Sequence, residues 1–333
     1  MKTLLFLILG LLLCSFELNA CENKGPNIIL FTLDGVRRQE FFKGTDPILR
    51  DQLPSNEPTS IFKSLWSKQS NQGIIFGSSD HYQIASHVSV SLPSYQALFT
   101  GHANDCKDNH CGTIQEKTFL ETIAQTLKLP AKDVAAFASW EGLKFAVASD
   151  ASKITEVIYP EIVNFPKDPV LMNLQHQAMK DLPTWHESRK DQYTFEMGMH
   201  YLKNYCPRIL YLSLVDSDEY GHIGDYPGYV KSLRTYDSYL EKIIQTLNLL
   251  GDYGKQTTLF VTTDHSRGDG LKWTIHGTDD PVEKNVFLFM KGRGVHPIGL
   301  TNKSATHANI RPSIEYLMGI KPTGPVLPHL SIQ

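Results

Sequence analysis

Five short runs of apolar and β-branched residues recur along the chain, and polar or glycine-containing sequence separates them. The runs are PNIILFTLD (26–34), VAAFASW (134–140), RILYLSLVD (208–216), TTLFVTTDH (257–265) and VFLFMKG (286–292). Runs this apolar are typical of strands that are buried on both faces, as in a parallel sheet. The pattern therefore predicts at least five strands of one buried sheet.

Segments with helical periodicity lie between these runs. Their apolar residues recur on one helical face, and Gly101 and Gly251 are the expected stop signals of two of them. The predicted helices cover 93–101, 118–129, 229–251 and 309–319. Strands that alternate with helices predict an α/β fold, doubly wound, with a mostly parallel sheet flanked by helices.

The 333 residues are enough for one large domain with a full hydrophobic core. The segment from about 150 to 200 is richer in Pro, Lys and His and lacks strong strand patterns, so we interpret it as a helical and loop insertion near the active-site face. Because no linker is visible, residues 21–333 are interpreted as a single catalytic domain. The net charge of −3 gives no reason to expect a nucleic-acid polymer as a partner.

The N-terminus is interpreted as a targeting segment and not as part of the fold. Lys2 precedes TLLFLILGLLLCSF, which is short for a membrane span, and the small residue Ala20 is a suitable cleavage position, so residues 1–20 predict a signal peptide. LNAC resembles a bacterial lipobox, in which Cys21 would be acylated. The protein is therefore expected to be exported, as a periplasmic or membrane-anchored lipoprotein or as a secreted protein, with a lipid on Cys21 as its only membrane contact.

The cysteines fit an oxidising compartment. Cys106 and Cys111 flank KDNH, a spacing that suits a small disulfide loop, whereas a zinc knuckle would need a second cysteine pair. Cys206 precedes a strand and is interpreted as a buried thiol.

Potential metal ligands follow three of the predicted strands. They are Asp34, Asp216, Asp218, His222, Asp264 and His265, with His276 in WTIHGTDD a little further on. Any one aspartate at a strand end is more often a turn or cap residue, but ligands of open α/β sheets bind beyond the carboxyl ends of the strands. Carboxylate and imidazole donors suit zinc, and two such sets suit a pair of zinc ions.

Five segments resemble the successive motifs of the alkaline phosphatase superfamily, in particular its nucleotide pyrophosphatase/phosphodiesterase-like branch. They are IILFTLDGVR, SLPSYQALFTG, VDSDEYGHIG, TTDH and IHG, in the same order across nearly the whole mature chain. The resemblance implies a hydrolase of phosphoric esters that holds two Zn²⁺ ions. The expected substrate is a small-molecule phosphate ester, either a monoester or a diester.

The resemblance also implies roles for individual residues. Asp34, Asp264 and His265 would bind one zinc together with the nucleophile Ser91. The second zinc would be bound by Asp218, His222 and His276. Ser217 replaces the proline of the family motif, which leaves Asp216 as the rival of Asp218; the four-residue spacing to His222 favours Asp218.

A phosphoryl oxygen would be held by an asparagine that follows the nucleophile helix. Asn109 in CKDNHC fits best and Asn104 is the alternative. A serine hydroxyl becomes a good nucleophile when a cation stabilises its alkoxide, and the helix that begins near Ser91 adds positive potential. The predicted reaction therefore passes through a phospho-Ser91 intermediate.

Two alternatives remain open at this point. SLPS is close to the sulfatase pattern in which a residue two before proline becomes formylglycine, but Tyr95 stands where that pattern has arginine, and histidines favour zinc over calcium. The chain could instead be a catalytically inactive surface-binding lipoprotein. Lys144 lies where some monoesterases of the superfamily carry a lysine, and it is also consistent with a surface lysine.

Overall fold

The computed structural model describes Cys21 and residues 25–332, except positions 166 and 184. The predicted signal peptide, residues 1–20, lies outside this range. Within it, no helix combines the length and the apolarity that a membrane crossing requires.

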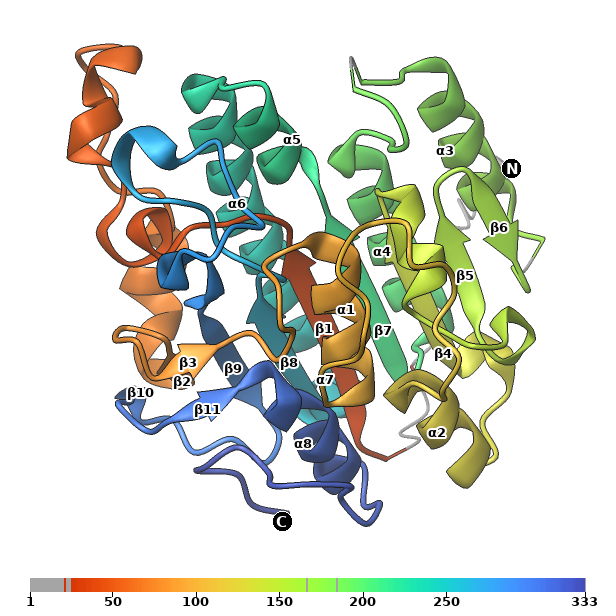
Figure 1. The fold of residues 1–333 in the computed structure, drawn as a ribbon. Helices are drawn as coiled ribbons and strands as arrows, with labels where there is room; N and C mark the ends of the chain where they lie inside the picture. The colour runs from red at the N-terminus through yellow and green to blue at the C-terminus, as the bar shows by residue number, and fades with distance from the viewer. Residues whose placement is uncertain (1–20, 22–24, 166, 184, 333) are drawn as a thin grey trace, which may run out of the picture.

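The described residues form one central sheet in the strand order β10-β2-β9-β8-β1-β7-β4-β5-β6 (Figure 1). Its strands are β1 (Asn27–Leu33), β2 (Ile74–Phe76), β4 (Val134–Ala138), β5 (Thr155–Ile158), β6 (Glu161–Val163), β7 (Ile209–Leu214), β8 (Thr257–Thr262), β9 (Leu288–Gly292) and β10 (Gly299–Leu300). A separate parallel pair is formed by β3 (Tyr82–Gln83) and β11 (Ala305–Thr306). All five strands predicted from the apolar runs are confirmed, as β1, β4, β7, β8 and β9.

The middle of the sheet is parallel, as predicted. β8, β1, β7, β4 and β5 run in the same direction, whereas β9 is antiparallel to β8 and β2, and β6 is antiparallel to β5. Because β1 lies between β7 and β8, the carboxyl ends of these three strands meet at one edge of the sheet.

Helices cover both faces of the sheet, which confirms the predicted α/β sandwich (Figure 1). Residues of α1 (Ser91–Thr100), α2 (Phe119–Thr126) and α8 (Ile310–Leu317) belong to one apolar core. The other core contains residues of α3 (Pro169–Lys180), α4 (Asp191–Tyr205), α6 (Tyr226–Leu249) and α7 (Gly251–Lys255). The short helix α5 (Asp216–His222) follows β7 and packs against α6.

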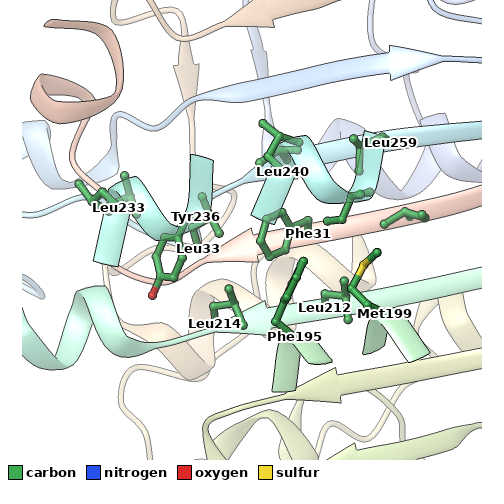
Figure 2. Packing of buried hydrophobic residues seen from close by; sticks show 14 of the residues in the cluster. Phe31, Leu33, Phe195, Met199, Leu212, Leu214, Leu233, Tyr236, Leu240 and Leu259 are labelled. Carbon is green, nitrogen blue, oxygen red and sulfur yellow. The ribbon is translucent and has the colours of Figure 1, made fainter. Parts of the chain in front are cut away.

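The central strand β1 shows why the sequence pattern is apolar throughout. Ile28 and Leu30 belong to the core under α1, while Phe31 and Leu33 belong to the core on the opposite face. Figure 2 shows Phe31 and Leu33 packed among residues of β7, α4 and α6. Successive side chains of a strand point to opposite faces, so a strand covered on both sides must be apolar at every position.

Two expectations about secondary structure are corrected. The segment 150–200, interpreted as a helical and loop insertion, also contributes two strands, because β5 extends the parallel sheet and β6 forms its edge. β6 reads EIV and is only partly buried, which explains why its pattern is weak. Gly251 does not cap α6; Leu250 does, and Gly251 begins α7 with a φ of +56°.

The prediction that Cys206 is a free buried thiol is wrong. Cys206 forms a disulfide with Cys21, with Cα atoms 5.8 Å apart. The reason is that the segment before β1 lies against the end of α4, where Arg208 Nε donates a hydrogen bond of 3.0 Å to the carbonyl oxygen of Pro26. Cys106 and Cys111 are also bridged, in the small loop that their spacing suggested.

Candidate active site

The predicted metal ligands come together at the carboxyl ends of β8, β1 and β7. Asp34 follows β1 directly, Asp264 and His265 follow β8 after one residue, and Asp218 lies in α5 just beyond β7. Ser91 is the first residue of α1. The topology therefore explains why residues far apart in the sequence share one site.

Asp34, Asp264 and His265 form a compact buried group beside Ser91. Their potential ligand atoms lie within 4.8 Å of one another, and all three side chains are essentially inaccessible. His265 Nε2 is 3.7 Å from Asp34 Oδ1, 3.4 Å from Asp264 Oδ2 and 3.2 Å from Ser91 Oγ. One ion placed among these atoms would contact both carboxylates, the imidazole and the hydroxyl.

Two carboxylate oxygens of this group lack a hydrogen-bond partner. Asp34 Oδ2 accepts from the Tyr95 hydroxyl at 3.0 Å and Asp264 Oδ1 accepts from the Gly35 amide at 3.1 Å. Asp34 Oδ1 and Asp264 Oδ2, in contrast, accept no hydrogen bond from any described residue although they are buried. Buried unpaired carboxylate oxygens are costly, and a cation between them removes that cost.

The pKa shifts follow from the same arrangement. Burial, and then the neighbouring carboxylates, raise the pKa of Asp34 well above its usual value. For the same reasons the pKa of Asp264 rises to about 7. Burial lowers the pKa of His265 to about 4, so its imidazole is neutral at pH 7. Neutral imidazole is the form that binds a metal ion.

Hydrogen bonds fix which nitrogen of each imidazole faces the site. His265 Nδ1 lies 3.0 Å from the carbonyl oxygen of Ser266, and His276 Nδ1 lies 2.8 Å from that of Ser89. A carbonyl oxygen only accepts, so Nδ1 carries the proton and Nε2 presents its lone pair to the site. A metal cation between these lone pairs and the carboxylates would remove the repulsion between them.

A second group lies directly beside the first. Asp218 Oδ2 is 2.8 Å from His222 Nε2, which is 3.3 Å from His276 Nε2. The rings of His265 and His276 stack with centroids 4.1 Å apart, and Asp218, His265 and His276 also form a potential ligand cluster. Burial, and then His265, lower the pKa of His276 to about 3. The two predicted ligand sets are therefore adjacent, as a two-metal site requires.

Arg267 is a member of the site that the sequence patterns did not single out. It follows Asp264 by three residues, is fully buried and donates two hydrogen bonds to Asp218 Oδ1, that from Nε measuring 3.0 Å. Burial alone would raise the pKa of Asp218, but this guanidinium and the two nearby histidines hold it well below its usual value. The sequence TTDHSRGDG contains no motif or regular spacing that would identify Arg267 as a residue of the site.

Asn109 lies where a contact to the substrate could form. Its Oδ1 accepts a 3.0 Å hydrogen bond from the amide of Leu92 in the first turn of α1, and its side chain lines the same cavity as Ser91. The alternative, Asn104, donates to Gln96 Oε1 at 2.8 Å and lines a separate cavity. The geometry therefore favours Asn109 for this role.

Asp216 and Lys144 lie apart from the ligand groups. Asp216 lines another cavity, with Lys190 and Lys231. The Nζ atom of Lys144 pairs with Glu141 and lies 3.7 Å from Glu161. The geometry thus favours Asp218 over Asp216 as the metal ligand. Lys144 points to Glu141 and Glu161 and does not line the cavity beside Ser91.

A cavity of about 390 Å³ opens beside Ser91 and contains Asp34, Asp218 and His222 in its lining. Trp140 and Phe145 supply aromatic surface. Three glutamates, Glu141, Glu187 and Glu219, also line it, and no Lys or Arg does so within the described part of the chain. Lys144 compensates Glu141 from outside the cavity, so Glu187, Glu219 and the aspartates are the carboxylates of the lining that remain for a metal ion to compensate.

The chain is similar to known metalloenzymes. Residues 184–322 match the family model of the Metalloenzyme superfamily. A phosphopentomutase of Carboxydothermus hydrogenoformans is 31% identical over 144 residues, which cover 42% of this chain and 34% of that protein. The chain thus spans about a third of the length of this curated relative.

Solved structures show the same fold. A phosphonate monoester hydrolase from Silicibacter pomeroyi superposes with a TM-score of 0.59 at 11% identity, over 91% of this chain and 76% of that one. A 2-O GAG sulfatase superposes with a TM-score of 0.57 at 13% identity, over 91% and 73% of the two chains. The chain is thus similar to the Metalloenzyme superfamily over residues 184–322, and its fold is that of these hydrolase and sulfatase structures.

Proposed function

We propose that the protein is a two-zinc hydrolase of phosphoric esters, with Ser91 as its nucleophile. The observation that carries this proposal is the pair of buried, unpartnered oxygens of Asp34 and Asp264, which face the lone pair of His265 beside the Ser91 hydroxyl. A divalent cation satisfies all of these atoms at once. Two carboxylates, one imidazole and a serine oxygen form a donor set that suits Zn²⁺.

The residues of the chain divide the work of the reaction. Asp34, Asp264 and His265 would hold one zinc, and Asp218, His222 and His276 would hold the other. The metals would supply stabilisation of negative charge on the attacking and leaving oxygens. Ser91 Oγ gives up its proton and attacks phosphorus, so that an Oγ–P bond forms while the bond to the leaving oxygen breaks and that oxygen departs as the alcohol. Water then cleaves the Oγ–P bond, which restores the Ser91 hydroxyl and releases a phosphomonoester from a diester or phosphate from a monoester.

The first turn of α1 positions the phosphoryl group. α1 begins at Ser91, so the positive end of its dipole points to the phosphoryl group that Ser91 would attack. Asn109 Oδ1 is used by the amide of Leu92, which leaves its Nδ2 donor for a phosphoryl oxygen. The Cys106–Cys111 bridge closes the loop that carries this asparagine.

The charge of the cavity favours a diester over a monoester. A monoester carries one more negative charge than a diester, and monoesterases bind it with Arg or Lys. Glutamates line this cavity instead, and its described lining contains neither cation. We therefore infer that singly charged phosphodiesters react faster than monoesters. A place in the nucleotide pyrophosphatase/phosphodiesterase-like branch is part of the same proposal.

Export from the cytoplasm is also part of the proposal. Support comes from the apolar stretch within residues 1–20 and from two disulfides, which form in oxidising compartments.

Paired substrates test the proposed function. Purified protein is incubated with zinc and assayed with bis(p-nitrophenyl) phosphate and with p-nitrophenyl phosphate, while bound metal is measured by mass spectrometry. We expect about two zinc ions per chain, at least tenfold higher kcat/KM for the diester, and a loss of roughly 10³-fold or more in Ser91→Ala.

The control is Ser94→Ala, because Ser94 is a buried serine of the same helix whose Oγ is directed to the carbonyl oxygen of Val88. It should retain wild-type turnover. Metal-free, inert wild-type protein would overturn the proposal, and turnover of an aryl sulfate with calcium would indicate a sulfatase. Transfer of the phosphoryl group to a sugar hydroxyl in place of water would indicate a mutase.

A further inference from the structure

We propose that Arg267 is a positioning residue for the second metal site, and that binding of zinc by Asp218, His222 and His276 depends on it. The inference rests on the proposed two-metal function. It concerns a residue that would contact neither substrate nor metal.

Arg267 contacts only one of the two carboxylate oxygens of Asp218. Arg267 Nε and Nη2 both donate to Oδ1, whereas Oδ2 lies 2.8 Å from His222 Nε2 on the side of the histidines. One oxygen is thus held by the guanidinium and the other is left for a metal ion. Two donors that converge on Oδ1 fix the position of that oxygen, and Oδ2 then lies on the side of the histidines.

Backbone carbonyls hold the guanidinium itself in place. Nη1 donates to the carbonyl oxygen of Thr274 at 2.8 Å, and Nη2 donates to that of Asp218 at 2.8 Å. Thr274 lies two residues before His276, so the same guanidinium links the two segments that supply these ligands. Arg267 is fully buried, and water therefore cannot replace these bonds without a rearrangement.

Two glycines of the sequence motifs make room for this arrangement. A Cβ atom on Gly221 would lie 2.7 Å from Arg267 Cζ, next to His222. A Cβ atom on Gly35, whose φ is +64°, would lie 2.1 Å from Asp218 Oδ1 and 3.0 Å from Arg267 Nε. The glycines that follow Asp34 and precede His222 thus fit the guanidinium and the carboxylate as one unit.

The two metal sites therefore differ in how their charge is balanced. In the site of Asp34 and Asp264, each of the two carboxylates has one buried oxygen without a hydrogen-bond partner among the described residues. In the other site, the single carboxylate of Asp218 is already paired with Arg267, and His222 is about half exposed. We infer that zinc binds in two steps, with the weaker step at Asp218, and that this step needs the geometry that Arg267 imposes.

Zinc titration against a chromophoric chelator tests the inference with Arg267→Lys, which keeps the buried charge but loses the planar pair of donors. Removing a hydrogen-bond partner of a metal ligand commonly weakens metal binding 10- to 100-fold, and we expect a loss of this size in the weaker step with the stronger step unchanged. His222→Ala identifies the weaker step, because His222 belongs only to that site. The unfolding midpoint without metal is recorded alongside.

Arg189→Lys is the matched control. Arg189 is also fully buried and also donates to backbone carbonyls, of Ala138 and Val157, but it is not part of the site. It should lower the unfolding midpoint without changing either zinc affinity. If the Arg267 variant loses stability in the same way but keeps both affinities, Arg267 is only structural and the inference is wrong.

Tighter zinc binding in Arg267→Met would also overturn the inference, because it would show that the arginine only competes with the metal for Asp218. If Arg267→Met does not fold, the lysine variant decides alone. Wild-type protein that binds no zinc would refute the proposed function and this inference together. Two unchanged zinc affinities in the variants would refute this inference alone.

Discussion

Tyr95 offers a test of the site at the level of one hydroxyl group. It is fully buried and donates to Asp34 Oδ2, so Tyr95→Phe leaves a second oxygen of this buried carboxylate unpaired. We expect a loss of about 1–3 kcal/mol in the free energy of unfolding of the metal-free protein. We also expect roughly 10- to 100-fold weaker binding at the stronger zinc step. Thermal unfolding and chelator competition measure the two effects.

Tyr82 provides the matching control, because it is equally buried but its hydroxyl has no partner among the described residues. Tyr82→Phe should leave the free energy of unfolding unchanged or raise it, and zinc binding should not change. Equal losses in the two variants would mean that the Tyr95 hydroxyl has no special relation to Asp34.

Single residues were predictable from the sequence where they end strands or keep a fixed spacing. Asp34 and Asp264 follow apolar strands. Asp218 and His222, which are four residues apart, contact each other across one turn of α5 as their spacing predicted. Tyr95 and Arg267 were not recognised as partners of these ligands. Their contacts join segments 61 and 49 residues apart, and no local pattern encodes such a distance.

At the level of elements, the apolar strands of the sheet centre were predictable, whereas the strand β5 with a buried charge was not. β1, β7 and β8 are apolar at nearly every position because helices cover both faces of the sheet. β5 reads TEVI, with a charge in its middle, although all four residues are buried. A buried charge in a strand contradicts the pattern rule, and this strand was therefore missed.

That charge gives a prediction about pH. Glu156 of β5 is 5% exposed and its Oε1 has no hydrogen-bond partner in the described structure. Burial, and then the charges of Glu121 and Glu161, raise the pKa of Glu156 to about 7. A raised pKa stabilises the fold below the unfolded value near 4.5, and this contribution is lost as the pH rises through about 7.

Glu156→Gln should therefore match the wild type in unfolding free energy near pH 4 and exceed it by about 3 kcal/mol at pH 8. Denaturant unfolding at both pH values measures the difference. Glu196→Gln, an exposed substitution on α4, should show no such dependence. A wild type that is as stable as Glu156→Gln at pH 8 would show that this carboxyl stays paired or solvated.

At the scale of the whole molecule, the two disulfides differ in what they hold together. Cys106 and Cys111 are 5 residues apart and close a local loop, whereas Cys21 and Cys206 are 185 residues apart and join the start of the described chain to the end of α4. Stabilisation by a disulfide grows with the length of the loop that it closes. The long-range bridge should therefore contribute more to the stability of the folded domain.

The double substitution Cys21→Ser with Cys206→Ser should lower the free energy of unfolding by about 5 kcal/mol, and Cys106→Ser with Cys111→Ser by about 2 kcal/mol. Denaturant unfolding with and without reductant measures both losses.

The Cys21–Cys206 disulfide also bears on the predicted lipid anchor, because a Cys21 sulfur that is bonded to Cys206 has no thiol left to form a thioether with a lipid. Non-reducing peptide mapping of the protein isolated from its native cells should yield the linked Cys21–Cys206 peptides. An acylated Cys21 with a free thiol at Cys206 would contradict the bridge and restore the lipoprotein interpretation.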